Sequence, residues 1–254
     1  MLIPYSLFKK EDYSSIINIS TANNLFFIDK IYYSHHNLYL PISINNHLAL
    51  ILYNLKLGRY LVYINKDNVL IEYEKLKSMV KKRKEEFNIF IDKLEKETSW
   101  LTSPASTRYH LDSQKGLLIH SVGVTSTLIE IKNTLMKSLS NESCVIVGLF
   151  HDLGKIGTFN KTLYIEDRSS YKYNKKVVSM GLAVRSLYLV SQYIKLTDDE
   201  AQAIAYHDGQ YISDNKVVAH KERPLTLLLH YADYWTAHMY ENEARRKELI
   251  DNSN

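Results

Sequence analysis

Imidazole and carboxylate side chains interrupt the most hydrophobic helical stretches of this chain, and they restrict how it can fold. His151 and Asp152 close the apolar run over residues 143–153, and Asp233 follows a second apolar run. Burying an ionised carboxylate in such surroundings is costly unless a cation compensates its charge. Imidazoles and carboxylates are also the ligands of divalent metals. We therefore interpret these residues, together with His120, as ligands of one metal ion.

The composition is typical of an ordinary globular protein. The 254 residues are 45% hydrophobic and 24% charged, which argues against disorder and allows one large domain with a small appendage. The net charge of +4 suits a phosphate-bearing substrate without being specific for one. The single cysteine, Cys144, lies in an apolar run and cannot form an internal disulfide. Abundant Tyr, Ile, Asn and Lys suggest an AT-rich genome, such as that of a virus.

No apolar run approaches the length of about 18 residues that a membrane span needs. The first residues lack the basic region and apolar core of a signal peptide. We therefore expect no membrane partner and a cytoplasmic location, in the host cytoplasm if the gene is viral.

Short runs rich in β-branched and aromatic residues predict a small antiparallel β unit within residues 1–71. Polar turn clusters separate the runs. Asp67 and Asn68 are predicted to connect residues 63–64 to residues 69–71 as a hairpin. The other predicted runs are residues 26–28 with 31–33, 38–44, 48–55 and 60–64.

From Glu72 onward, apolar residues recur at intervals of three and four, which predicts helices. We expect one connecting amphipathic helix over residues 72–97 and a helical domain over residues 98–254. The basic face of the connecting helix is interpreted as solvated, because no aromatic platform for nucleic-acid bases accompanies it. Further helices are predicted over residues 117–139, 143–153 and 177–194, from the capping box at Thr197 to His207, and from Pro224 towards Glu248.

The order of His120, then His151 and Asp152, then Asp233 resembles the H…HD…D pattern of the HD-domain phosphohydrolase superfamily. The segments around these residues resemble that family as well, over about residues 105–241. The chain is similar to HD proteins encoded by phages and by low-GC bacteria, and to the HD domain of bacterial 3′–5′ exoribonucleases. The resemblance implies a mainly α fold: an HD-type helical bundle around a metal site, here with a small N-terminal β-rich unit.

The resemblance also implies the chemistry. A metal-activated water would attack a phosphoester, with one divalent ion (Mn, Co, Ni, Fe, Zn or Mg) polarising a phosphoryl oxygen. Lys155 is expected to contact the substrate phosphate, and Asp152 is counted with it among the catalytic residues. The partner is a nucleotide or another phosphate ester, with short nucleic acid as an alternative, and a homodimer is compatible with the family.

Met180 stands about where relatives with two metals carry a histidine. We therefore favour a single ion, although His207 remains a candidate ligand for a second. His207 and Asp208 are alternatively expected to relay a proton or bind substrate, and Arg185 to pair with a phosphate.

Four more residues are candidates for supporting roles. Arg108, His110 and Lys115 precede the first ligand, and we predict that they bind phosphate or sugar. His230 shares a helix face with Asp233 and is a candidate hydrogen-bond partner of the metal ligands.

Three functions agree with these observations. The preferred one is hydrolysis of a small nucleotide, as in a nucleotidase. The first alternative is a 3′–5′ exonuclease or cyclic-oligonucleotide phosphodiesterase, and the second is a non-catalytic nucleotide-binding regulator. A P-loop is excluded because the glycines of residues 148–154 are spaced wrongly and Ile156 replaces the Ser or Thr that would bind magnesium.

Overall fold

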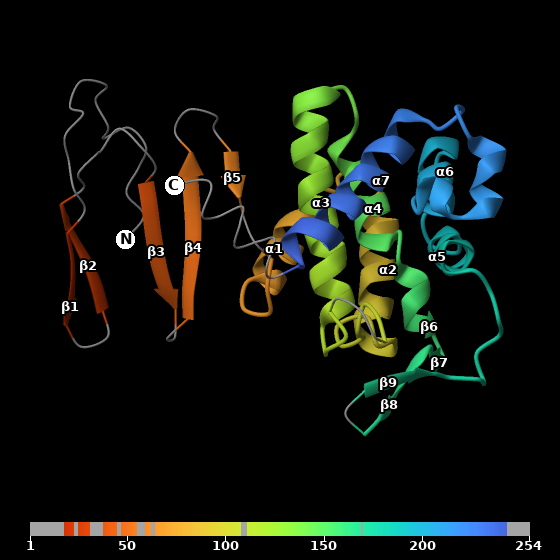
Figure 1. The fold of residues 1–254 in the computed structure, drawn as a ribbon, viewed down its shortest axis with the longest axis horizontal. Helices are drawn as coiled ribbons and strands as arrows, with labels where there is room; N and C mark the ends of the chain where they lie inside the picture. Colours follow the sequence, from red (N-terminus) through yellow and green to blue (C-terminus); the bar gives the residue numbers. More distant parts are fainter. Residues whose placement is uncertain are drawn as a thin grey trace. The chain divides into compact units, whose positions relative to one another are not determined.

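The computed structural model describes the backbone of five N-terminal strands, and residues 64–107, 111–168 and 170–242 together with their side chains. The chain divides into two compact units between Val62 and Tyr63, and each is described by itself (Figure 1). The predicted class is confirmed, since the larger unit is mainly helical and the N-terminal one contains strands.

The N-terminal strands pair in antiparallel fashion in two small sheets. One sheet has the order β1-β2 and the other the order β3-β4-β5. The predicted antiparallel unit is therefore confirmed, with β1 as an additional strand and with residues 31–33 outside the described part. The strands are β1 (Asn18–Ala22), β2 (Leu25–Lys30), β3 (Leu38–Ile44), β4 (His47–Asn54) and β5 (Arg59–Leu61).

The predicted hairpin strand over residues 69–71 is wrong, because helix α1 (Val69–Lys77) begins there. The Asn68 side chain accepts a hydrogen bond from the Asn65 N–H, and the Asn65 side chain accepts from the N–H groups of Asp67 and Asn68. These bonds close a turn whose last residue precedes the helix. Asn is as favourable at such a helix start as in a hairpin, which explains the error.

The single connecting helix predicted over residues 72–97 is instead two helices, α1 and α2 (Lys84–Glu97). Between them, the backbone N–H groups of Lys81 and Lys82 both donate to the Glu142 carboxylate, each at 2.7 Å. A partner distant in sequence therefore satisfies the amides that a continuous helix would have bonded internally. The apolar periodicity could not reveal it.

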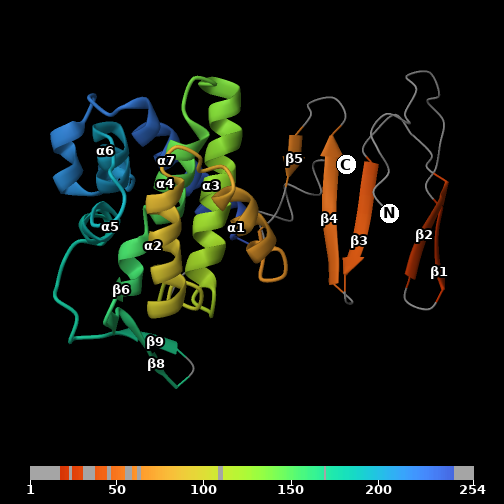
Figure 2. The same cartoon turned by 180° about the vertical axis from the view of Figure 1, so that it is seen from behind.

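Five more α-helices lie in the described residues of the larger unit. Helix α3 packs against α4 and α7, and α6 packs against α4, α5 and α7, as the two opposite views show (Figures 1 and 2). None of the helices that the structure describes is long and apolar enough to cross a membrane. The helices are α3 (Gly116–Leu135), α4 (Asn141–Phe150), α5 (Leu182–Ser191), α6 (Asp198–Tyr206) and α7 (Pro224–Trp235).

The end of α4 is fixed by the core of the unit. Phe150 packs against the rings of Phe87, Phe90 and Trp100, all fully buried. Gly148 lets α4 approach α3 closely, because a Cβ atom there would lie 2.6 Å from the Thr125 hydroxyl oxygen. Aromatic packing and close helix contact therefore hold the backbone immediately before His151.

Two predicted helix starts are confirmed. Thr197 and Glu200 form a reciprocal capping box at the start of α6, and Pro224 occupies the first turn of α7.

The region between α4 and α5 departs from the all-helical expectation. It contains the 3-10 helix η2 (Leu153–Ile156) and the small hairpins β6–β7 and β8–β9. Their strands, of two to four mostly exposed residues, are too short to give an alternating pattern: β6 (Gly157–Thr158), β7 (Lys161–Thr162), β8 (Tyr164–Asp167) and β9 (Ser170–Tyr173).

A buried ion cluster ties three elements of this unit together. Arg83, which the sequence placed on a solvated basic face, forms two hydrogen bonds to Glu200, of 2.6 and 2.7 Å, and one of 2.9 Å to Glu142. The Glu200 side chain is fully buried. Burial alone would raise the pKa values of both carboxyl groups, but the hydrogen bonds that they accept, chiefly from Arg83, together outweigh it and lower both.

We predict that Arg83→Met lowers the free energy of unfolding by about 3 kcal/mol at pH 7, because it leaves two buried carboxylates without their cation. Chemical denaturation followed by circular dichroism would measure the change. Lys96→Met is the matched control, since Lys96 pairs with Asp92 on an exposed helix face, and it should have almost no effect. Equal stability of wild type and Arg83→Met would contradict the role given to this cluster.

We also predict that acid weakens the protein through the same cluster. Both glutamates have folded-state pKa values below the ordinary value of 4.5. Their contribution is therefore complete above that value and is lost as the pH falls through the folded-state values. The stability of wild type should decline more steeply between about pH 5 and pH 3 than that of Glu200→Gln, in parallel urea titrations. If the stability of wild type and that of Glu200→Gln fall equally steeply with pH, Glu200 does not cause the loss of stability in acid.

Candidate metal centre

Helix ends bring the predicted metal ligands together. His120 lies in the second turn of α3, His151 caps the C-terminus of α4, and Asp152 follows it. Asp233 lies on α7, and His207 caps the C-terminus of α6. Because these helices pack on one another, five chemically related side chains from distant parts of the sequence meet in one place.

The distances within this cluster are short. His120 Nε2 lies 3.2 Å from Asp233 Oδ1, 3.4 Å from Asp152 Oδ2 and 3.3 Å from His151 Nε2. His151 Nε2 lies 3.8 Å from Asp152 Oδ2 and 4.0 Å from Asp233 Oδ1. His207 Nε2 lies 3.8 Å from Asp152 Oδ1. All four residues predicted as metal ligands therefore converge, and His207 joins them.

Each of the three imidazoles is held through its Nδ1 atom. His151 Nδ1 lies 2.8 Å from the carbonyl oxygen of Gly148, and His207 Nδ1 lies 2.9 Å from that of Ile204. His120 Nδ1 lies 2.8 Å from Glu241 Oε1. Carbonyl and carboxylate oxygens only accept, so Nδ1 is the donor in each ring. All three Nε2 atoms are thereby directed into the cluster, which is how histidines that bind metals are commonly oriented.

The charge states of the clustered side chains are those expected of a site that binds a cation. Burial lowers the pKa of His151 to about 4, so this ring is neutral at pH 7, as a metal ligand must be. Burial would raise the pKa of Asp233, but the hydrogen bond with His120 and the charge interactions with the nearby imidazoles together lower it and keep it ionised. Asp152 is likewise held ionised, chiefly by Lys155, against the effect of burial.

The donor atoms fit a divalent ion. Two sets of three have ligand atoms within 4.8 Å of one another: His120, His151 and Asp233, and His151, Asp152 and His207. The sets share His151. Nitrogen donors combined with carboxylate oxygens suit Mn, Fe, Co, Ni or Zn. The protein itself compensates part of the negative charge of this site. The surrounding carboxylates outweigh burial and raise the pKa of His120, so this ring holds a proton more readily.

Glu241 is a member of this site that the sequence analysis did not identify. It lies eight positions after Asp233, so in a regular α-helix the two would lie about 80° apart around the axis. A π-helical segment, η5 (Thr236–Tyr240), intervenes. The Glu241 N–H donates to the carbonyl of Thr236, five residues earlier, and this wide turn absorbs one extra residue. Glu241 thereby returns to the face of Asp233, a position that regular periodicity does not predict.

Lys155 lies at the edge of the cluster, on η2. Its Nζ atom is 2.5 Å from Asp152 Oδ2. Burial would lower the pKa of Lys155, but Asp152 outweighs this and raises it, so the ammonium group stays charged. The Lys155 and Asp233 side chains keep 14% and 21% of their surface exposed, whereas His151 is fully buried. The cluster can therefore be approached from the side of Lys155 and Asp233.

The other predicted contact residues lie around the cluster in different ways. Asp208 is 47% exposed, and its carboxylate lies 3.7 Å from His207 Nε2. Arg185 is buried and donates to the carbonyl oxygens of Val178 and Gly154, at 2.7 and 3.4 Å. Arg185 therefore stabilises η2 by bonding to its backbone. Its contact with a substrate phosphate stays a prediction.

Four further residues were predicted to have supporting roles. Lys115 immediately precedes α3, in the left-handed conformation. His230 Nδ1 lies 2.8 Å from the carbonyl oxygen of His207, so its link to the cluster runs through that residue. Arg108 and His110 lie outside the described residues.

We predict that Glu241→Gln weakens metal binding about tenfold and Glu241→Ala up to about a hundredfold, because the carboxylate fixes His120 and makes its Nε2 a stronger ligand. Competition with a chromogenic chelator for Zn²⁺ or Mn²⁺ would give the dissociation constants. Glu97→Gln is the control, since Glu97 pairs with Lys93 on the surface. Wild-type affinity in Glu241→Ala would refute this role.

Comparison with known proteins agrees with this geometry. The sequence model of the HD domain family matches residues 117–252, slightly more than half of the chain. A search of curated proteins and a search of solved structures each found no match. The matched region spans His120, His151, Asp152 and Asp233 in the order that characterises the family. The chain belongs to the HD-domain family, whose members are in general metal-dependent phosphohydrolases.

Proposed function

We propose that this protein hydrolyses a phosphoester of a nucleotide, in the manner of a nucleotidase. The observation that carries the proposal is the convergence of three Nδ1-anchored imidazoles on two ionised carboxylates. The proposed metal ligands are His120, His151, Asp152 and Asp233. A divalent ion held there would polarise a phosphoryl oxygen and lower the pKa of a water molecule.

The residues of the chain have distinct roles in this proposal. His151 and Asp152 follow the rigid end of α4 and keep their donor atoms in place. Lys155 stays charged beside Asp152 on the accessible side of the cluster. Its ammonium group is suited to bind a phosphate oxygen and to oppose the charge that develops there.

His207 and Asp208 provide a route for a proton. His207 Nε2 faces the cluster, 3.8 Å from Asp152 Oδ1 and 3.7 Å from the partly exposed Asp208. A proton taken up by this imidazole can pass to Asp208 and then to solvent. In the alternative arrangement, His207 is itself a metal ligand in the set that it forms with His151 and Asp152.

We predict that the purified protein releases phosphate from nucleoside phosphates only when Mn²⁺, Co²⁺ or a similar ion is present. Asp152→Asn should reduce the rate by about 10²–10³-fold, because it removes a charged ligand from the centre of the cluster. Asp92→Asn makes the same chemical change on an exposed face of α2 and should retain the wild-type rate. A phosphate-release assay over mono- and triphosphates would measure both.

The substrate panel should also contain cyclic dinucleotides and short RNA. Cleavage of these alone would replace the nucleotidase with the phosphodiesterase alternative, and oligomeric substrates should show a steep salt dependence. Identical rates for wild type and Asp152→Asn on every substrate would exclude an enzymatic role for this site.

A further inference from the structure

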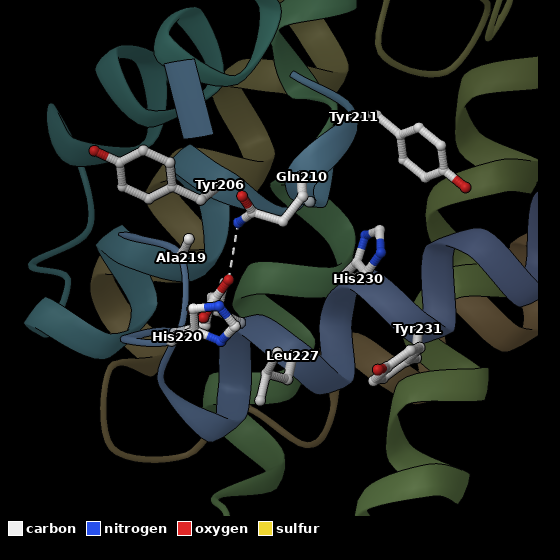
Figure 3. A pocket seen from close by; sticks show the side chains of 11 residues that line it. Tyr206, Gln210, Tyr211, Ala219, His220, Leu227, His230 and Tyr231 are labelled. Carbon is white, nitrogen blue, oxygen red and sulfur yellow. Dashed lines mark hydrogen bonds between the residues drawn. The ribbon is translucent and has the colours of Figure 1, made fainter. Parts of the chain in front are cut away.

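A cavity lies beside the metal centre, with a volume of about 700 Å³. The C-terminal end of α6 and the first half of α7 form two of its sides. The segments η3 (Gly209–Tyr211) and η4 (Ser213–Val218) follow α6, and the chain then returns past His220 and Glu222 to α7 (Figure 3). The cavity lies wholly within the helical unit.

The lining is aromatic and apolar with one polar edge. Rings of Tyr and His surround the space together with Leu227, and Figure 3 shows the His230 and Tyr231 rings on one side and Gln210 on the other. Gln210 Nε2 donates to Glu222 Oε1 at 2.9 Å. None of the described residues that line the cavity is Lys or Arg. It is therefore unsuited to a phosphate group and suited to an uncharged planar ring.

Glu222 determines which ligand groups this polar edge of the cavity can bind. A carboxylate only accepts hydrogen bonds, and it offers more acceptor positions than the single bond from Gln210 occupies. A ring that presents N–H donors can therefore bind there, whereas one that presents only carbonyl oxygens would be repelled. Amino-bearing nucleobases have such an edge, and proteins bind unpaired bases in this way, by stacking and by hydrogen bonds to the base edge.

The backbone around the cavity is held in place. His220 has a φ of +61°, in the left-handed region, which non-glycine residues adopt only when the surroundings require it. Gly209 has a φ of +67°, and a Cβ atom there would lie 2.4 Å from the His230 ring. The close contact between Gly209 and His230 joins the η3 side of the cavity to the α7 side.

The cavity and the metal centre share one residue as a boundary. His230 lines the cavity, and its Nδ1 atom lies 2.8 Å from the carbonyl oxygen of His207. The His207 ring faces the other way, with its centroid 4.8 Å from that of His151. The Asp208 carboxylate lies 3.7 Å from the same ring. A molecule with a phosphate at the metal centre and an attached ring thus has a complementary pocket next to its phosphate.

We propose that this cavity binds the base of the nucleotide substrate, with stacking on Tyr231 or His220 and with Glu222 accepting from an amino group of the base. The assignment rests on the proposed function for its link to catalysis, but binding of the base can be measured without catalysis. Guanine, which presents two adjacent donors, matches the carboxylate best, and uracil, which has no amino group, matches it worst.

Binding of free nucleosides to the full-length protein tests the proposal. Isothermal titration of wild type and of Asp152→Asn with guanosine, adenosine, cytidine and uridine should give guanosine the lowest Kd and uridine the highest. Tyr231→Ala should raise the Kd for guanosine about tenfold, by loss of stacking. Tyr188→Ala is the matched control, because Tyr188 is an equally exposed tyrosine on α5. Glu222→Gln should leave uridine binding unchanged and reduce the preference for guanosine.

Steady-state kinetics give the second arm of the test. Tyr231→Ala and Glu222→Gln should raise KM for guanosine monophosphate more than KM for glycerol phosphate, which carries no ring. If no nucleoside binds, or if both variants bind guanosine as wild type does, the assignment of the cavity is wrong. If guanosine binds as predicted but no phosphate ester is hydrolysed, the proposed catalytic function fails and the binding site remains.

Discussion

The fixed orientation of three imidazole rings is the constraint on which the rest of this structure depends. Each Nδ1 atom is bound to an acceptor belonging to a rigid element: two carbonyls at helix ends and one carboxylate. If the rings could rotate, the Nε2 atoms would no longer converge on the two carboxylates. Aromatic packing at Phe150 and close contact at Gly148 position the end of α4 for the same purpose. Packing in the hydrophobic core therefore fixes the position of the metal centre.

Charge is balanced locally in two separate places in the helical unit. Arg83 compensates Glu142 and Glu200 where the first two helices meet the rest of the unit. At the metal centre, Lys155 and a protonated His120 compensate Asp152 and its neighbours. In the first cluster, all the positive charge belongs to the protein. In the second, the oxygen and nitrogen donors are arranged so that a bound cation can replace the protons.

The sequence predicted the features that depend on local chemistry. An ionised side chain in an apolar helix has to meet a partner, and this alone identified His151, Asp152 and Asp233 as members of one site. Features that depend on residues distant in the sequence were not predicted. Apolar periodicity continued across residues 78–83, where Glu142 interrupts the helix, and Arg83 could not be separated from its exposed neighbours. Residues 69–71 have strand-forming side chains, yet the turn before them starts a helix.

The π-helical turn before Glu241 makes the length of the chain important there. A regular helix returns to nearly the same side of its axis after seven positions. Removing one of residues 236–240 would therefore restore regular hydrogen bonding and leave the carboxylate on the side of His120. Adding one residue would turn everything that follows by about 100° and carry the carboxylate away, although no residue of the metal centre had been altered. In descendants of this gene, this segment should therefore occur shortened by one residue but not lengthened by one.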